Sequence, residues 1–117
     1  GLQLQMAISY GGRQEIVDGC KALGRRIAEG SLRPEDITED VLSQQMYLPE
    51  VPDPELMIRT GGEYRISNFL LWQFAYSELY VTNLFWPDFG PKDLDDAIQF
   101  LETRERRFGR VEETVDE

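Results

Sequence analysis

The sequence predicts an α/β domain in which helices pack on a parallel sheet. Short strand-like apolar runs alternate along the chain with longer segments whose apolar residues recur at helical spacing. Two of the runs are followed by glycine pairs, Gly11-Gly12 and Gly61-Gly62, and sites in parallel sheets form at the carboxyl ends of strands. A chain of 117 residues has room for one domain, which we place at residues 1–110.

The first half of the chain is expected to hold a strand, a long helix and a polar connection. Residues 2–8 alternate and then become fully apolar, as in a strand that enters a covered sheet. Residues 14–29 keep apolar side chains at helical spacing, and Gly30 can end this helix. Cys20 lies on the apolar face of the helix, so we expect it in the core. Residues 31–45 are polar and indicate one or two short surface helices.

The second half is expected to hold two strands and two helices. Residues 56–58 are typical of a buried strand. Residues 69–76 are apolar nearly all round, which predicts a helix that is buried on most sides. Residues 78–85 are rich in β-branched and aromatic side chains and predict a further strand. The last helix is expected to begin near Pro91, where proline suits the first turn, and to end before Gly109.

Composition narrows the possible functions. The chain has 22 acidic and 12 basic residues and a formal net charge of −10, which opposes binding to nucleic acid. One cysteine excludes an internal disulfide and a thiolate metal site, and the absence of histidine removes the usual base at neutral pH. No apolar run approaches the ~20 residues that cross a bilayer, so we expect a cytoplasmic protein. The acidic residues 111–117 are expected to form a disordered tail.

The loop after residues 56–58 is a candidate diphosphate-binding site. Gly61-Gly62 can turn sharply and present backbone N–H groups, and Ser67 is a plausible N-cap for the helix expected after it. Arg59 and Arg65 suit phosphate because a guanidinium makes paired charge-assisted hydrogen bonds. The alternative is that both arginines pair with surface carboxylates and that the glycines form an ordinary turn.

Longer motifs around this loop resemble those of a known family. Residues 58–63 read Ile-Arg-Thr-Gly-Gly-Glu, residues 65–73 read Arg-Ile-Ser-Asn-Phe-Leu-Leu-Trp-Gln, and residues 86–89 read Trp-Pro-Asp-Phe. In this order they are similar to the signature of the cis-prenyltransferases. Residues 8–13 and 104–109 resemble the family too, so the resemblance covers nearly the whole chain. It implies the C-terminal half of the cis-prenyltransferase fold.

The resemblance also implies an activity. Family members are transferases that condense isopentenyl diphosphate with an allylic diphosphate, usually farnesyl diphosphate. Repeated cis additions build a long polyprenyl diphosphate such as undecaprenyl diphosphate. The family uses Mg²⁺ and forms homodimers, and its products serve at the membrane, so peripheral membrane contact through the product is expected.

The family's functional residues carry over to named positions of this chain. Those that match substrate-binding positions are Arg59, Arg65, Ser67, Arg107 and Gly109, of which the last two reach a diphosphate across the dimer. Glu78 matches a metal-associated glutamate, and a carboxylate suits a hard cation. The alternatives are a solvent-facing junction for Glu78 and, for the basic end of the last helix, a complement to the helix dipole.

The chain departs from the family in one respect. A full member is longer, and its first half carries an Asp-Gly-Asn-Gly-Arg-Trp motif with the catalytic aspartate, which this sequence lacks. The catalytic residues are therefore unknown, and this chain alone is expected to be inactive. Two other functions stay open: a non-catalytic subunit that dimerises through residues 69–89 and activates a partner, and a general anion-binding module.

Overall fold

The computed structural model describes the backbone of residues 2–116 and the side chains of residues 2–105. The chain divides into two compact units. Unit 1 comprises Gly1–Pro52 with Ser67–Trp72, and unit 2 comprises Asp53–Ile66 with Gln73–Glu117. Each unit is described by itself below.

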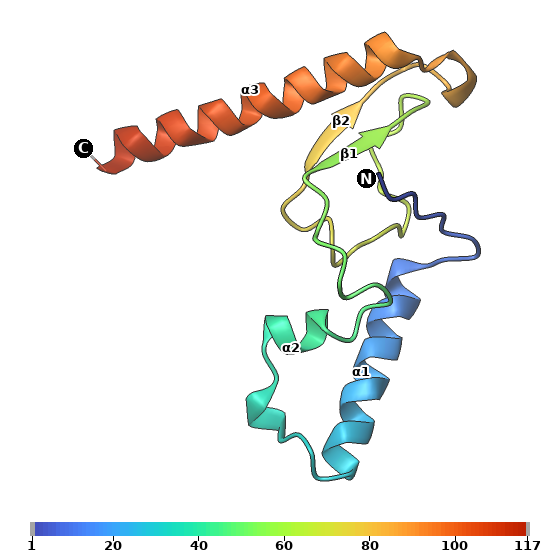
Figure 1. The fold of residues 1–117 in the computed structure, drawn as a ribbon, viewed down its shortest axis with the longest axis vertical. Coiled ribbons are helices and arrows are strands. Elements are labelled where there is room, and N and C mark those ends of the chain that lie inside the picture. Colours follow the sequence, from blue (N-terminus) through green and yellow to red (C-terminus); the bar gives the residue numbers. More distant parts are fainter. Residues whose placement is uncertain (1, 117) are drawn as a thin grey trace. The chain divides into compact units, whose positions relative to one another are not determined.

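Unit 1 is built on a long helix, α1 (Gly12–Ala28), which confirms the predicted helix. The short helix α2 (Glu39–Ser43) lies against α1 (Figure 1) and follows the 3-10 turn η1 (Pro34–Asp36), as the polar connection predicts. The buried face of α1 includes Gly19, where a Cβ atom would stand 2.8 Å from the side chain of Met46. A small residue there lets the segment after α2 approach the helix.

The first turn of α1 is capped by a distant residue. The N-cap residue Gly11 has no side chain that could accept a hydrogen bond from the first turn, and Asn68 supplies the acceptors instead. The Asn68 carbonyl accepts from the Gly12 N–H at 2.6 Å, and the Asn68 side-chain oxygen accepts from the Arg13 N–H at 2.9 Å. These bonds satisfy donors that a helix start otherwise leaves unpaired.

The segment that carries Asn68 does not form the predicted helix. Residues 69–76 form turns, so that prediction is wrong. Ser67, Asn68 and Leu70 have φ angles of 51°, 63° and 46°, in the left-handed region that a right-handed helix excludes. Ser67 is therefore not an N-cap. Contacts within unit 1, and not the apolar pattern, decide the conformation here. One of these contacts is a 2.8 Å hydrogen bond from the Trp72 indole N–H to the Ser43 hydroxyl.

Two further predictions for unit 1 are wrong. Residues 2–8 form no strand, and the apolar side chains of this segment are exposed, those of Leu2, Leu4, Met6 and Ile8. The described residues of unit 1 include no strand with which residues 2–8 could pair. Cys20 is exposed rather than in the core, although α1 is amphipathic, because the buried face of α1 passes through Gly19 and Leu23.

Unit 2 contains a parallel pair of strands, which confirms the α/β class. Strand β1 (Leu56–Arg59) pairs with β2 (Glu78–Val81) in the register Leu56↔Glu78 to Arg59↔Val81 (Figure 1). Both predicted strands are present, although β2 is shorter than residues 78–85. The 3-10 turn η2 (Trp86–Asp88) follows, and Met57 and Ala97 are buried in this unit.

The last helix, α3 (Pro91–Asp116), begins at the predicted residue. Its backbone continues past Gly109, the predicted end, and includes residues 111–116, which the sequence predicts as a disordered tail. Glutamate and arginine, both good helix formers, dominate residues 102–107 and favour continuation. Among the described residues no helix is both long and apolar enough to cross a membrane.

Candidate functional site

The glycine loop closes the carboxyl end of the strand pair. Gly61 and Gly62 have φ angles of 75° and 70°, which glycine adopts without strain. Their N–H groups donate to the carbonyls of Leu84 and Thr82, each at 2.8 Å. The expectation that these N–H groups are presented to an anion is therefore wrong. They fasten the loop to the segment that follows β2, and any anion bound here depends on side chains.

Arg59 is the residue that β1 delivers to this end of the sheet. Its Nε is buried and has no hydrogen-bond partner among the described residues. A buried donor without a partner costs about 1–3 kcal/mol, so such atoms indicate a missing ligand or water. Arg65 follows in the same unit and is exposed. Within residues 2–105 neither arginine has a carboxylate partner, which contradicts the alternative of simple surface ion pairs.

The other predicted substrate-binding residues lie in unit 1 or beyond the residues whose side chains are described. Ser67 is exposed and belongs to unit 1, whereas Arg59 and Arg65 belong to unit 2. Arg107 and Gly109 lie outside the residues whose side chains are described. Unit 2 thus holds the end of β1, the glycine loop, Arg59 and Arg65.

Glu78, the predicted metal residue, lies at the opposite end of the strand pair. It pairs with Leu56, three residues before the Arg59↔Val81 pair, so along the strand it stands roughly 10 Å from that end at about 3.3 Å per residue. Its Oε2 accepts a hydrogen bond from Arg104 Nε of α3 at 3.2 Å. Glu78 thus stands at the first residue of β2, and its role as a metal residue stays a prediction.

The chemistry of Glu78 nevertheless suits a magnesium ion. The described residues hold no group of three or more carboxylate, cysteine or histidine ligands. Magnesium does not need such a cage, because it keeps several waters and binds one or two carboxylates together with substrate phosphates. Within residues 2–105, Oε1 of Glu78 has no hydrogen-bond partner. Glu78 can therefore supply one oxygen ligand.

Unit 1 contains a buried carboxylate that the sequence did not lead us to expect. Glu15 of α1 is 2% exposed and accepts hydrogen bonds from the Tyr10 hydroxyl and, at 2.9 Å, from the Tyr47 N–H. Burial, with the bond to Glu15, raises the pKa of Tyr10 above its usual value. The signal was present, since Glu15 shares helical spacing with the buried Gly19 and Leu23.

Tyr47 carries the network to the surface. Its hydroxyl donates to Asp18, and this hydrogen bond raises the pKa of Tyr47 to about 12. The same bond, with a further one from Gln14, lowers the pKa of Asp18. The network joins the start of α1 to the loop after α2, so its role in unit 1 is to hold the two together.

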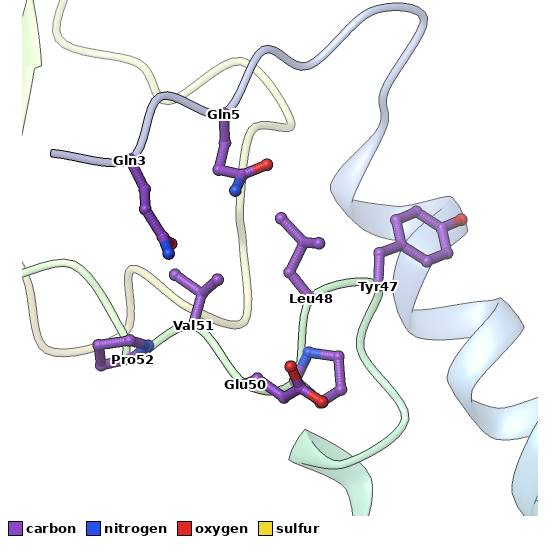
Figure 2. Close-up of a pocket in the computed structure, with 8 residues that line it drawn as sticks. Gln3, Gln5, Tyr47, Leu48, Glu50, Val51 and Pro52 are labelled. Atoms are coloured by element: carbon purple, nitrogen blue, oxygen red, sulfur yellow. The ribbon is translucent and has the colours of Figure 1, made fainter. Parts of the chain in front are cut away.

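A pocket of about 530 Å³ opens beside this loop. In Figure 2 the side chains of Gln3 and Gln5 point toward Leu48 and Val51, and residues 47–52 form the rest of the wall. Its lining includes no arginine or lysine and one carboxylate, Glu50. A diphosphate would find no cationic partner here, so this pocket is not a candidate for the predicted substrate.

Comparison with known proteins identifies the family. The undecaprenyl diphosphate synthase family of prenyltransferases matches residues 1–109. The chain is 49% identical over 112 residues to the ditrans,polycis-undecaprenyl-diphosphate synthase ((2E,6E)-farnesyl-diphosphate specific) of Escherichia coli K12, covering 96% of this chain and 44% of the relative. It is 52% identical over 110 residues to the isoprenyl transferase of Heliobacterium mobile, covering 94% and 42%. The chain thus spans less than half the length of these curated relatives.

Solved structures give the same result for the fold. Lavandulyl diphosphate synthase from Lavandula x intermedia, in complex with dimethylallyl diphosphate, aligns with a TM-score of 0.75 at 40% identity, over 81% of this chain and 41% of that one. A probable undecaprenyl diphosphate synthase from Campylobacter jejuni aligns with a TM-score of 0.69 at 37% identity, over 88% and 45%. The strand pair, the glycine loop with its two arginines and these matches together lead to one conclusion: the chain belongs to the undecaprenyl diphosphate synthase family of cis-prenyltransferases.

Proposed function

We propose that this chain is the part of a cis-prenyltransferase that binds isopentenyl diphosphate. The observation that carries the proposal is the buried Nε of Arg59 at the carboxyl end of β1, which has no hydrogen-bond partner among residues 2–105. A diphosphate oxygen would satisfy this donor, and the exposed guanidinium of Arg65, which pairs with no carboxylate within residues 2–105, could contribute a second contact. Ser67, Arg107 and Gly109 would complete the set that the resemblance implies.

The reaction of the whole enzyme would be the condensation of isopentenyl diphosphate with an allylic diphosphate. The names of two relatives support this substrate class, since one is specific for (2E,6E)-farnesyl diphosphate and another was solved with dimethylallyl diphosphate. Bound Mg²⁺ would neutralise charge on the departing diphosphate, and Glu78 is the residue of this chain that would help to hold it. Arg59 and Arg65 would orient the isopentenyl diphosphate. The homodimer, the cytoplasmic location and membrane contact through the product remain predictions.

Calorimetric titration of the chain with isopentenyl diphosphate tests the proposal directly. The wild-type chain is expected to bind it, and an Arg59→Ala, Arg65→Ala double variant is expected to lose most of the affinity. A hydrogen bond to a charged group contributes about 1.5–3 kcal/mol, so each arginine should account for at least about tenfold. A Lys21→Ala, Arg25→Ala variant is the control, because it removes the same charge from exposed positions of α1.

Two results would count against the proposal. Equal loss in both double variants would mean that net charge alone governs binding. Equal affinity for inorganic diphosphate and isopentenyl diphosphate would favour the general anion-binding module instead. Turnover is tested separately, by joining the N-terminal part of the Escherichia coli relative to this chain and supplying farnesyl diphosphate, isopentenyl diphosphate and Mg²⁺. A folded chimera without elongation activity would favour the non-catalytic subunit.

A further inference from the structure

Asn68 holds the loop that begins at Ser67 against the start of α1. Its carbonyl oxygen accepts from the Gly12 N–H at 2.6 Å, and its side-chain oxygen accepts from the Arg13 N–H at 2.9 Å. A Cβ added at Gly11 would stand 3.0 Å from Asn68 Nδ2. Because glycine has no Cβ, the loop can lie this close to the helix. Asn68 thus lies against three consecutive residues at the start of α1.

The backbone around Asn68 is strained. Ser67, Asn68 and Leu70 have φ angles of 51°, 63° and 46°. Glycine adopts this left-handed region readily, asparagine less so, and serine and leucine only at a cost. Such residues persist where the surrounding structure holds them, and they cluster at active sites and ligand clamps. The strain in this loop therefore suggests a role in binding as well as in capping.

Ser67 itself is held only through its neighbours. It is exposed, and its hydroxyl makes no hydrogen bond within residues 2–105. The residues that follow it are anchored, Asn68 by the two bonds to α1 and Phe69 by edge-on packing against Tyr10 at a centroid distance of 5.5 Å. Asn68 is thus the anchored residue directly beside Ser67, and the direction of the Ser67 hydroxyl depends on it.

We propose that Asn68 is a positioning residue for the diphosphate site: its hydrogen bonds to the start of α1 hold the Ser67 hydroxyl in the orientation that binds the substrate. The inference rests on the proposed function, in which Ser67 donates to the diphosphate of isopentenyl diphosphate. Asn68 acts through Ser67, since its own oxygens are taken by α1. A hydroxyl that is already ordered before binding loses less conformational freedom when the ligand arrives.

A double-mutant cycle of Asn68→Gly and Ser67→Ala, measured by calorimetric titration with isopentenyl diphosphate, tests this coupling. Glycine adopts a φ of 63° without strain, so Asn68→Gly removes the side-chain acceptor and frees the backbone. Binding is expected to weaken about five- to thirtyfold, because ordering the backbone of one freed residue costs that factor. In the Ser67→Ala background the same change should alter the affinity by less than about twofold, since no hydroxyl is left to position.

Thr38→Ala is the matched control for the loss of a helix cap in unit 1. The Thr38 side chain accepts from the Val41 N–H at 3.1 Å at the start of α2 and lies outside the Ser67 loop. Its removal is expected to lower the urea midpoint and to leave the affinity at the wild-type value. Asn68→Asp is the conservative variant, because it keeps the oxygen acceptor and tolerates a left-handed φ. Its added negative charge acts in both backgrounds, so Ser67→Ala should still cost its wild-type factor there.

Four results would overturn the proposal. They are equal losses from Asn68→Gly in both backgrounds, a loss no larger than that of Thr38→Ala, a smaller cost of Ser67→Ala in Asn68→Asp than in the wild type, and wild-type affinity in Ser67→Ala itself. The proposed function fails in a different measurement, namely when the Arg59→Ala, Arg65→Ala variant keeps the affinity of the wild type.

Discussion

Replacement of a glycine of α1 by alanine is expected to lower the stability of the chain at Gly12 and to raise it at Gly24. At Gly12 an added Cβ would meet Leu71 Cγ at 2.8 Å, the Asn68 carbonyl oxygen at 3.0 Å and the Leu71 nitrogen at 3.1 Å. Two of these three atoms are backbone, so the neighbouring loop must shift as a whole. At Gly24, further along the helix, no atom of the described residues lies within 4 Å of the added atom.

The magnitudes follow from these distances. Overpacking costs about 1–3 kcal/mol, and weakening the 2.6 Å hydrogen bond from Gly12 to Asn68 costs about 0.5–1.5 kcal/mol more. Gly12→Ala should thus lower the free energy of unfolding by about 1.5–4.5 kcal/mol. Gly24→Ala should raise it by roughly 0.5–1 kcal/mol, because alanine is the better helix former at an open position.

Urea unfolding followed by circular dichroism compares the two variants with the wild type. The slope against urea should stay the same in all three, so that the midpoints report stability. A Gly12→Ala chain as stable as the wild type would refute the close approach of the Asn68 loop to α1. A destabilised Gly24→Ala chain would refute the open surface at that position.

Two further predictions concern the glycine loop and the tyrosine network. Gly62→Ala should destabilise unit 2 by about 1–3 kcal/mol, since the residue has φ +70° and its Cβ would stand 2.8 Å from Asn83 Oδ1. Thermal unfolding checks this, with Gly24→Ala measured beside it. A Gly62→Ala chain with the melting temperature of Gly24→Ala would contradict the prediction. In the wild type, the hydrogen bond from Tyr47 lowers the pKa of Asp18. The stabilising effect of this hydrogen bond is therefore present above about pH 4 and is lost as the pH falls through the lowered pKa. The pKa of Tyr47 is raised to about 12, so the same contact is lost as the pH rises from about 10 toward that value. Tyr47→Phe should flatten both limbs of the pH profile measured by urea midpoints, and an unchanged profile would show that the contact contributes nothing.

The sequence predicted those elements whose pattern is local. Helix α1 and the start of α3 follow from helical spacing with glycine and proline at their ends, and β1 and β2 follow from short runs of strand formers. Arg59 and Arg65 were predicted to bind a diphosphate because guanidinium prefers phosphate, and this stays a prediction; the structure leaves both without a carboxylate partner in its described part.

The failures occur where contacts distant in sequence decide the conformation. Residues 69–76 read as a buried helix, yet Ser67, Asn68 and Leu70 have left-handed φ angles, and Asn68 caps α1 instead. Residues 2–8 read as a strand, which requires a neighbouring strand, and the described residues of unit 1 form none. The N–H groups of Gly61 and Gly62 were expected to bind an anion, but carbonyls beyond β2 take them. In each case the conformation depends on residues distant in the sequence, and no local pattern indicates which residues these are.

The cap on α1 bears on the order in which the chain folds. Arg13 and Asn68 are 55 residues apart, so the first turn of this helix cannot acquire its cap from its own neighbourhood. The rest of α1 can form early from local bonds, whereas its start must wait for a long loop to close. Hydrogen exchange at the Gly12 and Arg13 amides would therefore report the arrival of that loop, separately from the formation of the helix.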